Sequence, residues 1–179
     1  MKEGVVDGLE RGRVDTGSAA WLALATAGKE GMFADSERKA EAVVVRRGAI
    51  SNRGELIREC GVIAVNSALE VDLYGHVNST HLAGSRLVNG IGGSGDFLRN
   101  APLSIVTLGA TADDGAISRI VPMAAHVDHT EHDVDIVITE QGVADLRGLT
   151  PSARAETLLG NCAHPAFDPA LRDYPAAAD

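Results

Sequence analysis

Aromatic residues, cysteines and basic residues are all scarce in this sequence. Phe, Trp and Tyr together make up 3% of the 179 residues, so the hydrophobic core must be built from Val, Ile, Leu and Ala. Hydrophobic residues reach 45% and charged residues 23%, a balance that fits a globular chain and argues against disorder. An aliphatic, glycine-rich and aromatic-poor chain of this length is typical of a buried parallel sheet with helices on its faces.

The shortage of basic residues limits the class of partner. Lysine and arginine number 16 against 25 aspartates and glutamates, and the resulting net charge of −9 argues against a nucleic-acid partner. An anionic ligand remains possible, because a local pocket of backbone N–H groups can bind one whatever the overall charge.

Cysteine usage and the lack of long apolar runs bear on location. Cys60 and Cys162 are far apart and form no metal or redox motif, so we interpret them as free thiols in a reducing cytosol. No apolar run approaches the ~18 residues that a membrane span needs, and the N-terminus lacks the apolar stretch of a signal peptide. We therefore expect a cytoplasmic location and no membrane partner.

Short helices and strands alternate along the chain, which indicates the α/β class. Amphipathic spacing predicts a helix over 4–13, and the chain starts inside it without a cap, which predicts an N-terminally truncated domain. Asn52 and Glu55 have the spacing of a capping box that would open a helix through Cys60. The other expected elements are strands over 42–46, 62–65, 69–73, 103–108, 117–121 and 134–138, a turn over 74–76, a helix through Asn100, a helix from Pro151 to Leu159 capped by Thr150, an element of either kind over 21–25 and an irregular tail after Pro165.

The densest glycine cluster is Gly90-Ile-Gly-Gly-Ser-Gly95. Glycines let a backbone approach a ligand closely and aim its N–H groups at an anion. The cluster also has the Gly-x-Gly-x-x-Gly form of a dinucleotide site, but the acids at the required distance, Asp113 and Asp114, lie in a glycine-bounded loop. A purely structural turn is a third possibility. We favour a backbone site for an acyl or phosphate oxygen.

The segment His126–Asp133 carries three histidines at a spacing of three, together with three carboxylates. One helix face could present the imidazoles to a metal ion, but Val127 and Thr130 are poor helix formers. The alternative is a polar loop in which acids and imidazoles bond each other. We favour the loop and expect no bound metal.

Three further polar residues are candidates for catalysis. Asn52 at a helix start and Asn66 after a buried strand could each donate to a developing oxyanion, although Asn52 could equally be a helix cap. Glu140 follows a strand, where α/β sheets place catalytic groups. Its structural alternative is a cap or an ion pair with Arg147.

An ordered series of motifs resembles the acetyl-CoA hydrolase/transferase family of class I CoA-transferases, and within it the succinyl-CoA:acetate CoA-transferase branch. The resemblance is densest from about Ile50 to Pro165. Its motifs are Asn66–Asp72, Gly90–Phe97, Gly115–Ser118 with Ile120–Pro122, His126–Asp133, Thr139–Gly148 and Asn161–Pro165.

The resemblance implies a fold and a mechanism. Residues 1–179 would form most of the second of two open α/β domains, a three-layer sheet with helices on both faces. A glutamate attacks the acyl-CoA thioester and passes through an acyl anhydride to a glutamyl-CoA thioester, which a second carboxylate resolves. In this family the substrate is the CoA thioester, and no further cofactor is expected.

The resemblance also implies residue roles. Gly93, with Gly92 beside it, matches the glycine whose backbone N–H serves the oxyanion and the CoA site. Asn52 matches an asparagine next to the catalytic glutamate, and Leu69 and Asn89 match positions that line the CoA channel.

Two departures from the family pattern matter. The family's nucleophilic glutamate aligns upstream of Met1, so we expect the isolated chain to have no turnover. Asp113 stands where relatives carry a lysine, and an acid there would repel the CoA phosphates.

Three functions remain open from the sequence. The first is an acyl-CoA:carboxylate CoA-transferase, with succinyl-CoA and acetate as the favoured pair. The second is an acyl-CoA hydrolase, and the third is a non-catalytic module that binds CoA weakly or only packs against an N-terminal domain. We expect an exposed apolar patch where that domain docks, and a homodimer in the full-length form.

Overall fold

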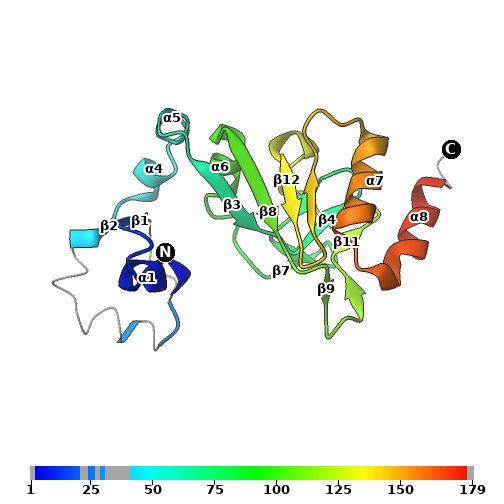
Figure 1. The fold of residues 1–179 in the computed structure, drawn as a ribbon, viewed down its shortest axis with the longest axis horizontal. Helices are drawn as coiled ribbons and strands as arrows, with labels where there is room; N and C mark the ends of the chain where they lie inside the picture. The colour runs from blue at the N-terminus through cyan, green and yellow to red at the C-terminus, as the bar shows by residue number, and fades with distance from the viewer. Residues whose placement is uncertain (1–2, 21–23, 27–28, 31–40, 177–179) are drawn as a thin grey trace. The chain divides into compact units, whose positions relative to one another are not determined.

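The computed structural model describes residues 3–20, 24–26, 29–30 and 41–176, which fall into two compact units (Figure 1). The first unit is Met1–Arg53 and the second is Gly54–Asp179. From the sequence we expected one domain over residues 1–179. In the structure, contacts between residues group the chain into these two units, with the boundary after Arg53. Most of the 21–25 segment, for which either kind of element was expected, lies outside the described residues.

The first unit combines short helices with two strands that pair in parallel. Val6 of the first helix is buried against Leu24 and Val43, so the amphipathic face predicted for this helix is confirmed. The helix ends earlier than the predicted residue 13, and Gly12 follows it with φ of +64°, a conformation that glycine adopts at little cost. The elements are α1 (Glu3–Glu10), β1 (Gly17–Ala19), β2 (Val43–Val45) and α4 (Gly48–Ser51).

The second unit is built on a four-stranded sheet in the order β13-β12-β8-β3 (Figure 1). β3 (Ile63–Ser67), β8 (Leu103–Thr107) and β12 (Ile136–Ile138) are parallel, while β13 (Val143–Asp145) pairs with β12 in the antiparallel sense. The aliphatic runs in the sequence predicted β3, β8 and β12 because buried parallel strands need apolar side chains on both faces. The α/β prediction is confirmed.

One face of this sheet carries the core of the unit. Its small and branched residues pack with α6 (Ser94–Asn100) and α7 (Pro151–Asn161) in one buried cluster. From the sheet the cluster draws Ala64, Val106, Val137 and Ala144, and from the two helices it draws Leu98, Ala155, Leu158 and Leu159.

The opposite face of the same sheet is apolar and open. By register it consists of the alternate strand residues, and Ile63, Val65 and Val143 are 59%, 61% and 54% exposed. Ile105 and Ile136 between them are half-buried. Helices were expected on both faces, but in the described residues of this unit the buried cluster contains no residue of this face.

The C-terminal segment is helical, and the expectation of an irregular tail is wrong. α7 begins as predicted, with the Thr150 hydroxyl accepting a hydrogen bond from the N–H of Ala153 at 3.3 Å. After it come η2 (Pro165–Phe167) and α8 (Asp168–Ala176), and Leu171 of α8 is buried in the core cluster. Proline does not prevent the helical turn at the start of this segment, because Pro165 sits in the first turn of η2, where its missing N–H costs nothing.

Small sheets and turns support the loops of the second unit. The turn predicted over 74–76 is confirmed: the buried Asp72 carboxylate accepts hydrogen bonds from the N–H groups of Tyr74, Gly75 and His76 at 3.0 Å each. The remaining elements are α5 (Gly54–Glu59), β4 (Glu70–Asp72), β5 (Val77–Asn78), β6 (His81–Leu82), β7 (Arg86–Leu87), β9 (Thr111–Ala112), β10 (Ile117–Ser118), β11 (Ile120–Val121) and η1 (Glu131–Asp133).

Both cysteines are free, as predicted, with Cys60 exposed and Cys162 buried. Burial raises the pKa of the Cys162 thiol, which makes it a poor nucleophile at neutral pH. Within the described part of the chain, no helix has the length and apolar character needed to cross a membrane.

Candidate active site

The glycine loop leads from β7 into α6 and presents its backbone at the surface. Gly92 has φ of +59°, which favours glycine at that position. Gly93 is the N-cap of α6, with φ of −96° and ψ of 8°, and is half-buried. Gly90 and Gly92 are exposed. The short helix predicted after the cluster is confirmed, and the exposed part of the loop lies directly before Gly93.

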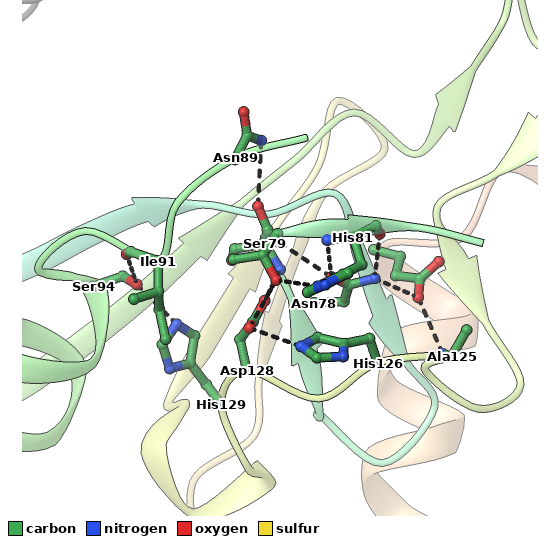
Figure 2. Close-up of polar contacts among 12 residues, drawn as sticks. Asn78, Ser79, His81, Asn89, Ile91, Ser94, Ala125, His126, Asp128 and His129 are labelled. Atoms are coloured by element: carbon green, nitrogen blue, oxygen red, sulfur yellow. Dashed lines mark hydrogen bonds and ion pairs between the residues drawn. The ribbon is translucent and has the colours of Figure 1, made fainter. Parts of the chain in front are cut away.

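A buried histidine holds the end of this loop. The Ser94 hydroxyl donates to the carbonyl of Ile91 at 2.7 Å and lies 2.9 Å from Nε2 of His129 (Figure 2). Because the serine proton goes to Ile91, Nε2–H of His129 is the donor to Ser94. His129 is 1% exposed, and burial lowers its pKa, so the imidazole is neutral. The loop is therefore tied to the segment His126–Asp133.

The three histidines of that segment do not converge. Only η1 is helical there, and each imidazole has a different partner. His126 lies 3.2 Å from Asp128, and the exposed His132 lies 3.2 Å from Glu131, while His129 faces Ser94. The polar-loop interpretation is the one that these hydrogen bonds support.

Asp128 fastens the same loop to the segment after β5. Its carboxylate accepts from Ser79 N–H at 2.7 Å and from the Thr80 hydroxyl at 2.8 and 2.9 Å (Figure 2). Burial opposes ionisation of Asp128, but these hydrogen bonds and the neighbouring His126 outweigh it, so its pKa lies below the ordinary value.

Leu69 and Asn89, the two residues expected to line a CoA channel, both form hydrogen bonds with residues 78–80. The N–H of Leu69 donates to the Asn78 carbonyl at 2.8 Å. Asn89 donates through its side chain to the carbonyl of Ser79 at 3.3 Å, and through its backbone N–H to that of Thr80 at 3.2 Å. Residues 20 positions apart in sequence thus meet on one short stretch of chain.

Asn52 closes a helix instead of opening one. It is the C-cap of α4, its N–H donating to Gly48, and α5 begins two residues later, at Gly54. The capping-box prediction is wrong at this position because a one-turn helix, too short to leave a periodic signal, ends at Asn52. The residue is half-buried and belongs to the first unit, whereas Gly93 belongs to the second.

Asn66 and Glu140 have structural surroundings of different kinds. The side-chain nitrogen of Asn66 is buried without a hydrogen-bond partner among the described residues. The Glu140 carboxylate accepts from the N–H of Ala110 at 2.8 and 3.1 Å, and these bonds to the backbone lower its pKa. Arg147 pairs with Asp145 at 2.6 Å, so the expected alternative of a Glu140–Arg147 ion pair is wrong.

The hydrogen bond from Ala110 makes stability depend on Glu140 ionisation. The folded-state pKa is lowered, so the unfolded chain binds the proton more readily, and stability rises with pH through this range. The contribution is complete above the ordinary pKa of 4.5 and is lost as the pH falls below it. Urea unfolding between pH 6 and pH 3 should therefore show a smaller loss for Glu140→Gln than for the wild-type chain. Parallel pH curves would contradict this assignment.

Asp113 stands at the tip of the β9–β10 hairpin. It is exposed and has φ of +51°, and Asp114 beside it has φ of +50°. Aspartate tolerates this left-handed conformation better than lysine does, so the backbone conformation favours aspartate over lysine at position 113.

Sequence reasoning missed Ser94 and His81 as polar partners in this region. Ser94 meets a residue 35 positions away, and His81 stacks on His126 with ring centroids 3.9 Å apart. Neither residue stands in a motif that marks its partner, so no local pattern could have found the pairs.

The fold and the exposed glycine loop define a class of protein. RipA from Yersinia pestis aligns over 99% of this chain and 41% of its own, with a TM-score of 0.81 and 25% identity. The 4-hydroxybutyrate CoA-transferase of Porphyromonas gingivalis aligns over 100% of this chain and 44% of its own, with a TM-score of 0.74 and 26% identity. The chain has the α/β fold of a CoA-transferase domain.

The family follows from the sequence. Residues 28–175 match the acetyl-CoA hydrolase/transferase C-terminal domain, and the chain belongs to this family, as predicted. The propanoyl-CoA:succinate CoA transferase of Escherichia coli K12 is 51% identical over 97% of this chain and 35% of its own length. The succinyl-CoA:acetate CoA-transferase of Clostridium kluyveri is 58% identical over 75% of this chain and 25% of its own.

A second group of relatives carries a different activity in its name. The acetyl-CoA hydrolase of Saccharomyces cerevisiae is 46% identical over 97% of this chain and 34% of its own length. The chain spans about a third of the length of the curated relatives that match nearly all of it.

Proposed function

We propose that this chain is the CoA-facing part of an acyl-CoA:carboxylate CoA-transferase that uses succinyl-CoA and acetate or similar short acids. The observation that carries the proposal is the Gly90–Gly95 loop, which is exposed over Gly90–Gly92 and is held at its end by the Ser94–His129 hydrogen bond. Transferases at 51% and 58% identity support the choice of reaction.

In the proposed reaction each carbonyl is attacked in turn. A glutamate carboxylate adds to the acyl-CoA thioester, CoA thiolate leaves, and an acyl-glutamyl anhydride forms. The thiolate then attacks the glutamyl carbonyl, releases the first carboxylate and leaves a glutamyl-CoA thioester. Acetate then takes the same steps in reverse order: it attacks the glutamyl-CoA thioester, passes through an acetyl-glutamyl anhydride and leaves as acetyl-CoA. The glutamate carboxylate is thereby restored. The N–H of Gly93 would stabilise the oxyanion at these steps, while Leu69, Asn89, Gly92 and Asp113 would face the CoA. Asn52 would keep the role that the family pattern gives it, next to the catalytic glutamate.

Acyl-CoA hydrolysis is the second candidate, and relatives named acetyl-CoA hydrolase favour it. The two differ in what resolves the covalent intermediate, water or a second carboxylate. In either case the CoA thioester is the substrate, and no resident cofactor is required. We also propose a cytoplasmic location and a homodimeric complete protein.

Acceptor dependence separates the two activities. Residues 1–179 should replace the matching segment of the E. coli propanoyl-CoA:succinate CoA transferase, because that enzyme aligns with nearly all of this chain. With succinyl-CoA as donor, we expect acetyl-CoA to form only when acetate is present. Release of free CoA at one rate with and without acetate, and with no acetyl-CoA formed, would overturn the transferase proposal. The isolated 179-residue chain should show no turnover in the same assay.

The open face of the central sheet is proposed to dock another domain of the complete protein. Exposed branched aliphatic residues on a sheet mark an interface more often than a solvated surface. Val65, at 61% exposure, lies on this face. The separately expressed N-terminal two thirds of the E. coli relative should bind the chain, and Val65→Glu should weaken that binding about tenfold or more.

A matched substitution off the sheet controls for added charge. Tyr174 on α8 is 40% exposed, and Tyr174→Glu should leave the binding unchanged in the same titration. Equal binding by the Val65→Glu and wild-type chains would place the interface elsewhere.

A further inference from the structure

Two segments distant in sequence bring two imidazoles and a carboxylate together. The ligand-capable atoms of His81, His126 and Asp128 all lie within 4.8 Å of one another, and all three residues are half-buried (Figure 2). His81 belongs to β6, and the other two belong to the loop before η1. We propose that these three side chains bind a divalent transition-metal ion.

The distances suit the first coordination sphere of such an ion. Nε2 of His126 lies 3.2 Å from Oδ1 of Asp128. Two ligands on a tetrahedral ion with bonds of about 2.0–2.1 Å are separated by about 3.3 Å. An ion between these atoms would replace the hydrogen bond that now joins them, with little movement of either side chain. His81, whose ring packs against that of His126 with centroids 3.9 Å apart and planes tilted by 39°, would complete the set by a small shift.

Proton positions leave His81 with a free lone pair. The Thr80 hydroxyl lies 2.8 and 2.9 Å from the two Asp128 oxygens and 2.7 Å from Nδ1 of His81. Its single proton goes to the carboxylate, so Nδ1–H of His81 donates to the hydroxyl. The imidazole is then the tautomer whose Nε2 can coordinate a metal. A ring N–H held by a neighbour is the usual support of a metal-bound histidine.

The backbone around the cluster is fixed before any ion arrives. Asn78, fully buried, accepts through its side-chain oxygen from the N–H groups of Thr80 and His81 at 3.1 and 3.0 Å. Ser79 N–H holds Asp128, and Glu70 accepts from both Asn78 and the N–H of Ala125. These bonds join the two segments at several points, so the chain loses little conformational freedom when an ion binds.

The ligand set indicates the class of ion. Two imidazoles and one carboxylate with open positions suit Zn²⁺, Fe²⁺ or Ni²⁺ and not the all-oxygen ions Mg²⁺ and Ca²⁺. This set differs from the three-histidine helix face weighed in the sequence, because His129 and His132 have other partners. The ion would link β6 to the loop before η1. Ser79, whose carbonyl accepts a hydrogen bond from the Asn89 side chain, lies close to β6 in the chain.

Zinc binding to the untagged 179-residue chain tests the proposal. After treatment with a chelator and its removal, isothermal titration with ZnCl₂ at pH 7.5 should give one site per chain. His81→Gln and His126→Gln should each weaken binding at least 10-fold. Thr80→Val should weaken it about 10-fold, because it removes only the support of the ligands. Circular dichroism of the zinc-free variants checks that each is folded.

His132→Gln is the matched control. His132 is 82% exposed in the same loop and lies outside the proposed ligand set, so this variant should bind zinc as the wild type does. Three results would overturn the proposal: no saturable binding, wild-type affinity in both His81→Gln and His126→Gln, or a loss in His132→Gln as large as in those two.

Discussion

Gly93→Leu should lower transferase turnover about 100-fold or more, with little change in thermal stability. The enzyme to be assayed is the chimera in which residues 1–179 replace the matching segment of the E. coli propanoyl-CoA:succinate CoA transferase. The backbone at Gly93, with φ of −96° and ψ of 8°, lies in the bridge region that L-residues can adopt, so the substitution does not require a left-handed conformation. A side chain there would instead keep the acyl oxygen away from the N–H. The loss of one oxyanion donor costs about 100- to 1,000-fold in turnover.

Gly90 offers a matched control in the same loop. A Cβ built on Gly90 meets no other atom within 4 Å, so Gly90→Leu adds the same side chain to open space. This variant should retain turnover within a fewfold of the parent in the same assay. Gly92 is unsuitable, because its φ of +59° would strain any other residue. A fall in melting temperature that matches the loss of activity at position 93 would indicate a structural turn only.

Local signals predicted the elements that carry one strong pattern. The run Leu103–Leu108 and the run Val134–Ile138 are aliphatic enough to be central strands, and the structure contains β8 and β12 there. Thr150 followed by Pro151 fixed the start of α7, because a hydroxyl cap and a proline at the first position both favour it. Elements without such a local pattern depend on how they pack in the folded chain.

The errors arose where tertiary contacts or very short elements dominate. α8 forms despite its two prolines because Leu171 is buried in the core cluster and Arg172 pairs with Asp168 at 2.9 Å. Asn52 follows a helix of a single turn, which has too few residues for a periodic pattern. The sequence could not assign the expected apolar patch to this face of the sheet, because strand alternation does not say which partner covers a face.

Some features of the candidate site were also predicted by local sequence patterns, whereas others were not. The composition of the Gly90–Gly95 loop predicted a backbone site for an anionic oxygen, and the structure exposes Gly90–Gly92 just before the start of α6. Leu69 and Asn89 came from the family resemblance alone, since nothing in their local pattern separates them from ordinary apolar or polar positions. Asn52 was a candidate from its expected place at a helix start, and the resemblance added its role next to the catalytic glutamate. The Ser94–His129 and Thr80–Asp128 contacts join residues 35 and 48 positions apart, and only the fold reveals them.

The largest loss of stability is expected when Leu158 of α7 is shortened to alanine. Leu158 is fully buried, in the same cluster as Val106, Val137 and Ala144 of the central sheet. Removing its three terminal carbons leaves a cavity that the surrounding strands cannot fill without moving. The free energy of unfolding should fall by about 2–5 kcal/mol, measured by urea denaturation of the 179-residue chain.

Leu87 provides the same chemical change without a cavity. It lies on β7 of the same unit and is 65% exposed, so Leu87→Ala should change the free energy of unfolding by less than about 0.5 kcal/mol. Both variants lose the same three carbons, so the difference between them measures the effect of burying this side chain in the core cluster. If Leu158→Ala were no more destabilising than Leu87→Ala, α7 would not be part of the core that supports the glycine loop, and the packing of α7 and α6 on one face of the sheet would have to be revised.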